Sequence, residues 1–350
     1  MGDPLGGDAA FHQTLLTLHR LQPFSSAYFN GRQKELFSYS AENLNAARGL
    51  LTACSERPRF FSGTVSPPDE LFREVRIADL LKFFENSSAY ILRHRLGIKP
   101  EEKTSPLEER EVFALDNLQA YAIKKELLAH VISGKNAHDL HPVIRARGVL
   151  PPAGQGDNIF NKLATEATEF AGQVMQTING QQFLPPLDVD FTIGEFRVYG
   201  RISSILPEQL LRYRSSKLSA KDQVKLWIEH LILNFVAAET YPKQSTLIML
   251  NGSVVLSPVT DSKALLEILL QRYWQGLTKP LHFFPRSSLA YATKGKLSAA
   301  EAQWNNDKYP ESADPAYKLC FGDDSPLDGE FEEVSTDVFK AYLESAGVEQ

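Results

Sequence analysis

The order of helical and strand-like segments between residues 157 and 256 constrains the fold more than any other feature of this sequence. Apolar residues recur first with a helical period and then, after Asn179-Gly180, in short runs typical of strands. Ser219 caps the second predicted helix, and Asn251-Gly252 is a strong hairpin signal. The predicted elements are a helix over residues 157–178, strands over 187–193, 196–205 and 209–217, a helix over 220–238, and strands over 245–250 and 254–256. This order predicts a mixed α/β core, in which an antiparallel three-stranded meander with 209–217 as a central strand precedes a helix and a strand.

Four regions are expected along the chain. They are an N-terminal helical and irregular extension over residues 1–68, a helical region packed on the core over 69–156, the α/β core with following helices over 157–300, and an acidic C-terminal tail over 301–350. Pro67-Pro68 marks the first boundary as a stiff, extended link. Aromatic and aliphatic residues at helical spacing between residues 76 and 97 are read as core rather than as a base-stacking platform. In the tail, residues 305–333 look rich in loops and residues 336–345 predict a last helix.

The charge is distributed unevenly. The whole chain carries −6, whereas residues 301–350 alone contain 13 acidic and 3 basic residues, a net charge of −10. Residues 1–300 therefore carry about +4, so the acidic average does not exclude a nucleic-acid partner. With 43% hydrophobic and 23% charged residues, the composition is that of a folded globular protein.

Several classes of function lack their sequence signals. The two cysteines, Cys54 and Cys320, have no CxxC spacing, and His138 and His141 have no third metal ligand nearby. No phosphate-binding glycine loop, serine-hydrolase elbow or HExxH helix occurs, so neither a cofactor nor a small-molecule substrate is expected. No long apolar run and no secretory signal is found, which predicts a cytoplasmic location without a membrane.

The order of the predicted elements resembles the core of PD-(D/E)xK nucleases. These enzymes hold Mg²⁺ with an acid on the second strand and an acid on the third, where a lysine follows. In the RecB-like branch the second strand reads Gly-x-x-Asp, and here Gly200 is followed by Ser203 at the aspartate position. The third strand has Arg212-Tyr213-Arg214 where the branch has Asp-Tyr-Lys. The resemblance thus implies a nuclease scaffold with degenerate positions Ser203, Arg212 and Arg214, and with no metal, although Gln223 and Trp227 fill the pattern of the following helix.

Five successive blocks of the sequence resemble the carboxy-terminal domain of the RecC family, the gamma subunit of exodeoxyribonuclease V. The blocks are AYFNGRQKELFSYS, RIADLLKFFENSSAYILRHRLGI, EVFALDNLQAYAIKKELL, LLRYRSSKLSAKDQVKLWIEHL and LHFFPRSSLAYA. This resemblance implies a carboxy-terminal piece of a larger subunit that handles single strands or a fork of DNA beside RecB and RecD, which carry the motors and the nuclease. The chain by itself is then not an enzyme. The iron–sulfur cluster of the related AddB subunits is excluded, because only two cysteines are present.

Two hypotheses about the site follow. In the first, a non-catalytic domain contacts phosphates through basic residues between positions 201 and 230, and the alternative is that these residues form an ordinary solvated face. The predicted DNA-contacting residues are Arg201, Arg212, Arg214, Lys217, Lys221 and Lys225. In the second, Asp188 and Asp190 are the displaced metal ligands of an active nuclease, although no acid-x-lysine pattern follows on the next strand.

Overall fold

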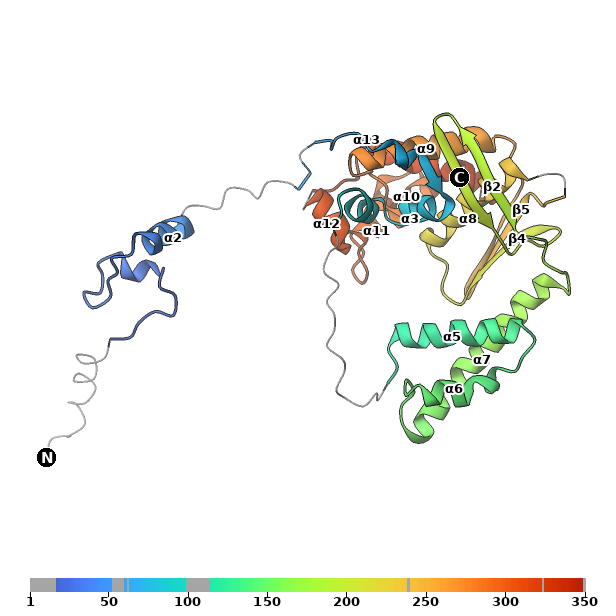
Figure 1. Ribbon diagram of the computed structural model, residues 1–350, viewed down its shortest axis with the longest axis horizontal. Helices are drawn as coiled ribbons and strands as arrows, with labels where there is room; N and C mark the ends of the chain where they lie inside the picture. Colours follow the sequence, from blue (N-terminus) through green and yellow to red (C-terminus); the bar gives the residue numbers. More distant parts are fainter. Residues whose placement is uncertain are drawn as a thin grey trace. The chain divides into compact units, whose positions relative to one another are not determined.

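The computed structural model describes residues 17–51, 60–61, 63–98, 114–237, 240–322 and 324–348. The chain divides into two compact units, Met1–Pro58 and Arg59–Gln350. Among its described residues, the first contains a 3₁₀ turn, η1 (Ser26–Tyr28), and helix α2 (Ala41–Leu51). The second contains the α/β core and the remaining elements (Figure 1). Within the described residues, no helix is both long and apolar enough to cross a membrane.

The first sheet has the strand order β1-β3-β2. Strands β2 (Leu187–Ile193) and β3 (Phe196–Ile202) form the predicted antiparallel hairpin, in which Val189 lies opposite Gly200. Strand β1 (Glu74–Arg76) pairs with β3 in parallel, a pairing that the sequence did not predict. Gly200 has a φ of +151°, and a Cβ atom there would lie 3.2 Å from the side chain of Ile77. The glycine of the Gly-x-x-Asp position is therefore required by the close approach of a helix.

The second sheet contains β4 (Gln209–Arg214), β5 (Gln244–Met249) and β6 (Gly252–Leu256) in that order. The prediction that 209–217 is a central strand of an antiparallel meander is wrong. Strand β4 is an edge strand that pairs in parallel with β5, and only an isolated bridge between Ile205 and Leu210 joins it to the end of β3. The backbone turns at Ser204, whose φ is +60°, and this turn takes β4 out of the first sheet. The mixed α/β class and the order of the elements are confirmed.

Three helices cover the strands and supply many side chains of the core. They are α3 (Ile77–Glu85), α8 (Ala220–Val236) and α9 (Ser262–Thr278). The Ser219 hydroxyl accepts a hydrogen bond from the Asp222 amide and caps α8, as predicted. The largest core cluster joins side chains of these helices to both sheets, among them Phe83, Val198 and Trp227. The aromatic and aliphatic residues read as core before Gly97 are indeed buried, namely Phe83, Phe84, Tyr90, Ile91 and Leu92.

The helices between β1 and β2 form two groups. The first group follows α3 and contains α4 (Ser87–Tyr90) and a π-helical turn, η3 (Ile91–Arg95), while the 3₁₀ turn η2 (Glu70–Arg73) precedes β1. The other group, residues 114–178, is here named the α5–α7 lobe and contains α5 (Asn117–Ile132), η4 (Ala137–Leu140), α6 (His141–Ala146) and α7 (Ala153–Ile178). Helices α5 and α7 cross below the body in Figure 1. They contact the second sheet through a cluster that includes Leu128, Phe170, Leu211 and Ile248.

The C-terminal region is more ordered than the sequence predicted. It contains α10 (Pro285–Lys294), α11 (Leu297–Trp304), η5 (Glu311–Ala313), α12 (Pro315–Phe321) and α13 (Gly329–Ser345). The expectation of a loop-rich stretch over 305–333 is wrong, because Tyr317 and Phe331 are buried with Phe284 and Trp304 in a core cluster. The predicted last helix exists and is longer than expected. Its side chains Val338 and Phe339 belong to the main core, so the acidic region packs on the body.

Candidate functional site

Two of the three positions that the sequence predicts to be degenerate, Ser203 and Arg212, contact each other between β3 and β4. Arg212 donates two hydrogen bonds to Glu229 on α8, with N–O distances of 2.7 Å and 2.8 Å. Its remaining nitrogen donates to the main-chain oxygen of Ser203 at 2.7 Å. Side chains of Arg212 and Glu229 are only 23% and 14% exposed. The Arg212 guanidinium thus links β4 to both Ser203 and Glu229. All three of its nitrogens donate hydrogen bonds to other groups of the domain.

Arg214 lies two residues further along β4, on the same side of the strand as Arg212. Its Nε donates to the Tyr121 hydroxyl of α5 at 2.9 Å, and its Nη1 donates to Asp222 of α8 at 3.0 Å. The guanidinium also lies 5.2 Å from the centre of the Tyr121 ring. Since 46% of the Arg214 side chain is exposed, it retains a solvent-facing part that Arg212 lacks.

Sequence reasoning missed the partners of these arginines. Asp222 and Glu229 are seven residues apart, two turns of a helix, and therefore lie on one face of α8. Arg212 and Arg214 are two residues apart on a strand and also share a face. The paired spacings were a usable signal that two arginines of a strand meet two acids of the next helix.

The other predicted DNA-contacting residues do not converge with the arginines of β4. Arg201 lies on the first sheet and donates to Asp188 at 2.6 Å, while Lys225 pairs with Glu85 of α3. Lys217 is exposed and Lys221 is half-buried, and neither forms an ion pair with another described residue. The six predicted residues thus do not form one surface. Four of them are ion-paired, namely Arg201, Arg212, Arg214 and Lys225, whereas Lys217 and Lys221 lie unpaired near the start of α8, close in sequence to Arg214.

Asp188 and Asp190, the candidate ligands of the alternative nuclease, do lie on one face of β2 and are exposed. Each is held by an arginine of β3. Asp190 accepts two hydrogen bonds from Arg197, at 2.9 Å and 2.8 Å, and these bonds hold the pKa of the carboxyl below its ordinary value. Among the described residues, no group of three His, Cys, Asp or Glu side chains is arranged to hold a metal ion. The two carboxylates have the surroundings of cross-strand ion pairs.

Gln223 and Trp227, which match the helix pattern of the RecB-like branch, contact other parts of the domain interior. The Gln223 side-chain oxygen accepts a hydrogen bond from the Tyr342 hydroxyl of α13 at 2.7 Å. Trp227 is buried and stacks against His230, with 5.8 Å between ring centres. Burial lowers the pKa of His230 to about 4, so the ring is neutral near pH 7 and is held between Ser245 and the main-chain oxygen of Ser257.

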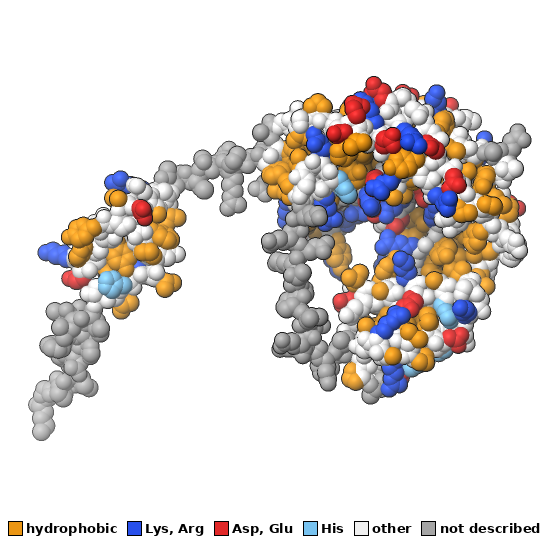
Figure 2. Space-filling model, in the orientation of Figure 1, with side chains coloured by type: hydrophobic (Ala, Val, Ile, Leu, Met, Phe, Trp, Pro, Cys, Tyr) orange, Lys and Arg blue, Asp and Glu red, His pale blue; other side chains and the backbone are white. Residues whose placement is uncertain are grey.

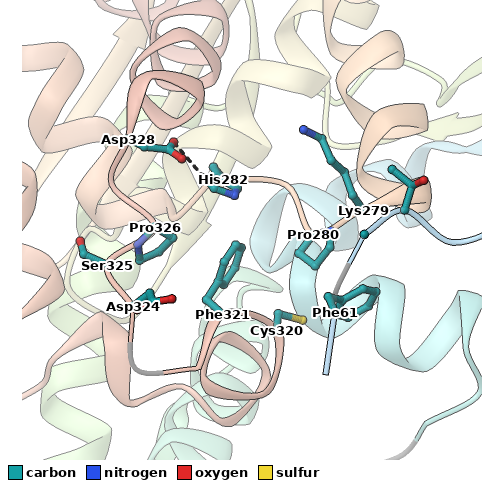
Figure 3. A pocket seen from close by; sticks show the side chains of 12 residues that line it. Phe61, Lys279, Pro280, His282, Cys320, Phe321, Asp324, Ser325, Pro326 and Asp328 are labelled. Atoms are coloured by element: carbon teal, nitrogen blue, oxygen red, sulfur yellow. Dashed lines mark hydrogen bonds and ion pairs between the residues drawn. The ribbon is translucent and has the colours of Figure 1, made fainter. Parts of the chain in front are cut away.

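The histidine pair and the lone described cysteine lie elsewhere. His141 contacts Asp157 at 3.0 Å, while His138 is placed beside Asn136 at 3.3 Å. Cys320 borders a cavity of about 450 Å³, where Figure 3 shows Phe321 in the middle and the His282–Asp328 pair on one wall. Burial raises the pKa of the Cys320 thiol to about 11, so it is protonated at neutral pH and is a poor nucleophile.

The surface around the site is basic. Figure 2 shows Lys and Arg side chains gathered on the side of the body that faces the α5–α7 lobe. Tyr121, Arg214, Lys217 and Lys221 belong to the elements that meet there, since α5 packs on β4 and α8 follows it. Chemically, this surface offers cations and one aromatic ring, and it lacks the grouped carboxylates of a magnesium site.

Comparison with known proteins identifies the family. The model of the RecC C-terminal domain matches residues 72–296. The RecBCD enzyme subunit RecC of Escherichia coli (strain K12) is 23% identical over 91% of this chain and 28% of that protein. The subunit of the same name from Mycolicibacterium smegmatis is 26% identical over 79% of this chain and 26% of that protein. The chain thus spans about a quarter of the length of these relatives. Because the family model covers well over half of its residues, the chain belongs to the RecC C-terminal domain family.

Proposed function

We propose that this chain is a non-catalytic DNA-handling and subunit-docking domain of a RecBCD-type helicase and nuclease complex that acts in recombinational repair of double-strand breaks. Its partners are RecB, RecD and single-stranded or forked DNA. The observation that carries the non-catalytic part is the closed ion pair between Arg212 and Glu229. The complex and its partners are inferred from the relatives, which are RecC subunits of RecBCD enzymes.

The ion pair opposes metal-dependent catalysis for an electrostatic reason. Magnesium in a nuclease is held by several carboxylate oxygens and draws a water toward the scissile phosphate. Here a guanidinium, which stays charged at every accessible pH, lies where the RecB-like strand has its acid. Glu229 cannot coordinate a metal ion while its carboxylate accepts both hydrogen bonds from Arg212. In this proposal an arginine takes the place that the positive ion has in a nuclease.

The prediction that the chain binds no divalent metal ion is tested by calorimetry with Mn²⁺ on the whole chain. We expect no site-specific heat, and we expect the Ser203→Asp, Arg212→Asp double variant to acquire binding if the scaffold is that of a nuclease. The control is Asp190→Ala. Binding by the unaltered chain that disappears in Asp190→Ala would overturn the proposal in favour of an active nuclease with displaced ligands.

DNA handling is supported by the smaller basic group near the start of α8. Arg214 is half-exposed, and Lys217 and Lys221 have no acidic partner among the described residues. Phosphate contacts by such side chains give weak, sequence-independent binding through the release of counterions. Arg201, Arg212 and Lys225 are held by carboxylates, so we assign the phosphate contacts to Lys217, Lys221 and the exposed part of Arg214, which also pairs with Asp222.

The DNA part is tested by the salt dependence of single-strand binding. Three engaged cations correspond to a log–log slope of about −2, at roughly 0.7 for each phosphate contact. Arg214→Gln, Lys217→Gln and Lys221→Gln should each reduce the slope by somewhat less than one, whereas Lys294→Gln, which changes the exposed last residue of α10, should leave it unchanged. An unchanged slope in all three variants, with folding intact, would remove this surface from DNA handling.

Docking is tested in the complete complex. Deletion of the domain from the longer subunit should weaken the association of RecD more than that of RecB, as measured by pull-down with each partner. A stable interface of this kind buries about 800 Å² on each side. Equal retention of both partners after the deletion would contradict the docking role and leave the metal and DNA tests unaffected.

A further inference from the structure

A groove of about 540 Å³ lies between α7 and the hairpin of β5 and β6. On this face of the second sheet α7 packs in a cluster with Leu211 and Ile248, and that cluster contains no residue of β6. The volume falls within the range of roughly 300–1,000 Å³ in which ligand pockets occur. None of the described residues that line the groove is charged. They carry amide, hydroxyl and aliphatic groups, and among them are Gln173, Thr177, Gln209, Thr246, Ser253 and Val255.

Strand β6 is a free edge of its sheet. It is the last strand in the order β4-β5-β6, and among the described strands it pairs only with β5. The hairpin closes through a tight turn at the pair Met249–Gly252, and main-chain groups along an antiparallel pair alternate in direction. Those of Val254 therefore point to β5, whereas the N–H and C=O groups of Ser253 and Val255 point outward. These outward groups make no hydrogen bond to another described residue.

This free edge lacks the usual protection. Soluble proteins guard edge strands with charged side chains, prolines or bulges. Residues 244–260 contain no charged residue, and β6 contains no proline. Val255 is 43% exposed, and Leu250 in the adjoining turn is 46% exposed. An uncharged, partly apolar edge of this kind is a template for pairing with another chain.

The domain covers only the far end of this edge. The Ser257 amide donates to the main-chain oxygen of Ser345 at 3.0 Å, and the Ser345 hydroxyl donates to the main-chain oxygen of Ser257 at 2.8 Å. Ser345 is the last residue of α13, so the main chain that follows β6 is satisfied within the domain. The uncovered part of the edge therefore runs from the hairpin turn to Val255, beside the groove.

We propose that an extended, uncharged segment of a partner subunit pairs with β6 as an added strand and places alternate side chains in the groove. The proposal rests on the proposed docking function and specifies which surface docks and what kind of segment it receives. In strand addition, main-chain hydrogen bonds give affinity and pockets for alternate side chains give specificity. Ser253 and Val255 supply the main-chain groups, and the groove favours amide, hydroxyl or aliphatic side chains.

Two other occupants fit less well. Nucleic acid is disfavoured because phosphate contacts need cations, and none lines the groove. A second copy of this chain would offer the same uncharged edge, but on both copies Ser257 is already bonded to α13. The two edges could then pair over only a few residues, whereas a stable interface buries about 800 Å² on each side. A partner segment can fill the groove as well as pair with the edge.

The test compares the affinity of purified RecD and of purified RecB for the whole chain and for variants at one position. Val255→Pro removes an outward N–H, and proline is tolerated on an edge strand when its missing N–H faces outward. Val254, which precedes it, is in a strand, as suits a residue before proline. We expect one subunit to bind on the order of tenfold more weakly or worse, because an acceptor in the added strand loses its donor. The matched control Val255→Ala keeps the N–H and should retain most of the affinity.

Hydrogen exchange gives a second readout on the unaltered chain. The amides of Ser253 and Val255 should exchange more slowly when the subunit is bound, whereas the amide of Val254, already bonded to β5, should change less. If Val255→Pro does not fold, Val255→Lys takes its place. This variant leaves the main chain unaltered and brings a charge to the edge and the groove, so it should also weaken binding.

The contrary outcomes separate this inference from the docking function. If a subunit binds with no protection of β6 and no loss of affinity in the variants, docking stands on another surface and this inference fails. If neither subunit binds, both fail together. Protection of Ser253 and Val255 that grows with the concentration of the chain alone would make a second copy the occupant, and protection by single-stranded DNA would make nucleic acid the occupant. Either result would overturn the proposal.

Discussion

Replacing Arg212 with alanine isolates the energetic role of the closed ion pair. The variant leaves Glu229 with no partner for its two charged hydrogen bonds, in a position that is only 14% exposed. Removing one member of a buried pair costs about 3–5 kcal/mol, since the remaining charge stays desolvated. The residual exposure of this pair places it at the lower end, so we expect a loss of about 3 kcal/mol.

The matched control is Arg201→Ala, which breaks the pair with Asp188. Those side chains are 64% and 74% exposed, and an ion pair on the surface contributes little to stability because water and salt screen it. The free energy of unfolding of each variant is obtained by urea denaturation with linear extrapolation. The Arg212→Met, Glu229→Met double variant should recover much of the loss, because it removes both charges. If Arg212→Ala costs no more than Arg201→Ala, the reasoning that the pair is desolvated and locked is refuted.

Three further predictions concern stability. Gly200→Ala should lower the melting temperature, because alanine is strained at a φ of +151° and its Cβ would press on Ile77; a melting temperature equal to that of the unaltered chain would refute this. Since the pKa of buried His230 is about 4, below its unfolded value near 6.5, stability should be full above pH 6.5 and fall by roughly 3 kcal/mol toward pH 4; an equal fall in His230→Gln would contradict this. Ser219→Ala should cost about 1 kcal/mol of unfolding free energy by removing the α8 cap, and no measurable loss would argue against the cap.

The elements that were predictable from sequence are those whose signals are local. The β2–β3 hairpin and the cap at Ser219 depend on residues within a few positions of each other, and both are confirmed. The placement of β4 was missed because its partner β5 lies 35 residues further along, after α8, so no local period reports the pairing. The helix α12 was missed because it is short and its burial depends on contacts with α10 and α11.

The sequence named candidate site residues, whereas the contacts of those residues could not be derived from it. Comparison of strand motifs pointed to Ser203, Arg212 and Arg214. Arg212 contacts Ser203 between β3 and β4, whereas Arg214 contacts Tyr121 and Asp222. The ion pairs of Arg212 with Glu229 and of Arg214 with Asp222 could not be derived from a count of charges. They depend on which faces of β4 and α8 lie opposite each other. The six basic residues were therefore predicted as one strip, although Arg201 and Lys225 have acidic partners on other elements.

The parallel pairing of β1 with β3 has a consequence for the kinetics of folding. Glu74 and Arg197 are register partners that lie 123 residues apart in the chain, so the first sheet closes only after a long loop has been brought together. The entropy of closure grows with the logarithm of loop length, and non-local pairings of this kind form slowly. Most of the intervening loop is the α5–α7 lobe, which has its own core cluster around Phe160 and can collapse early. A lobe that has already condensed shortens the effective loop, so a substitution such as Phe160→Ala should slow closure of a sheet whose residues belong to a different cluster.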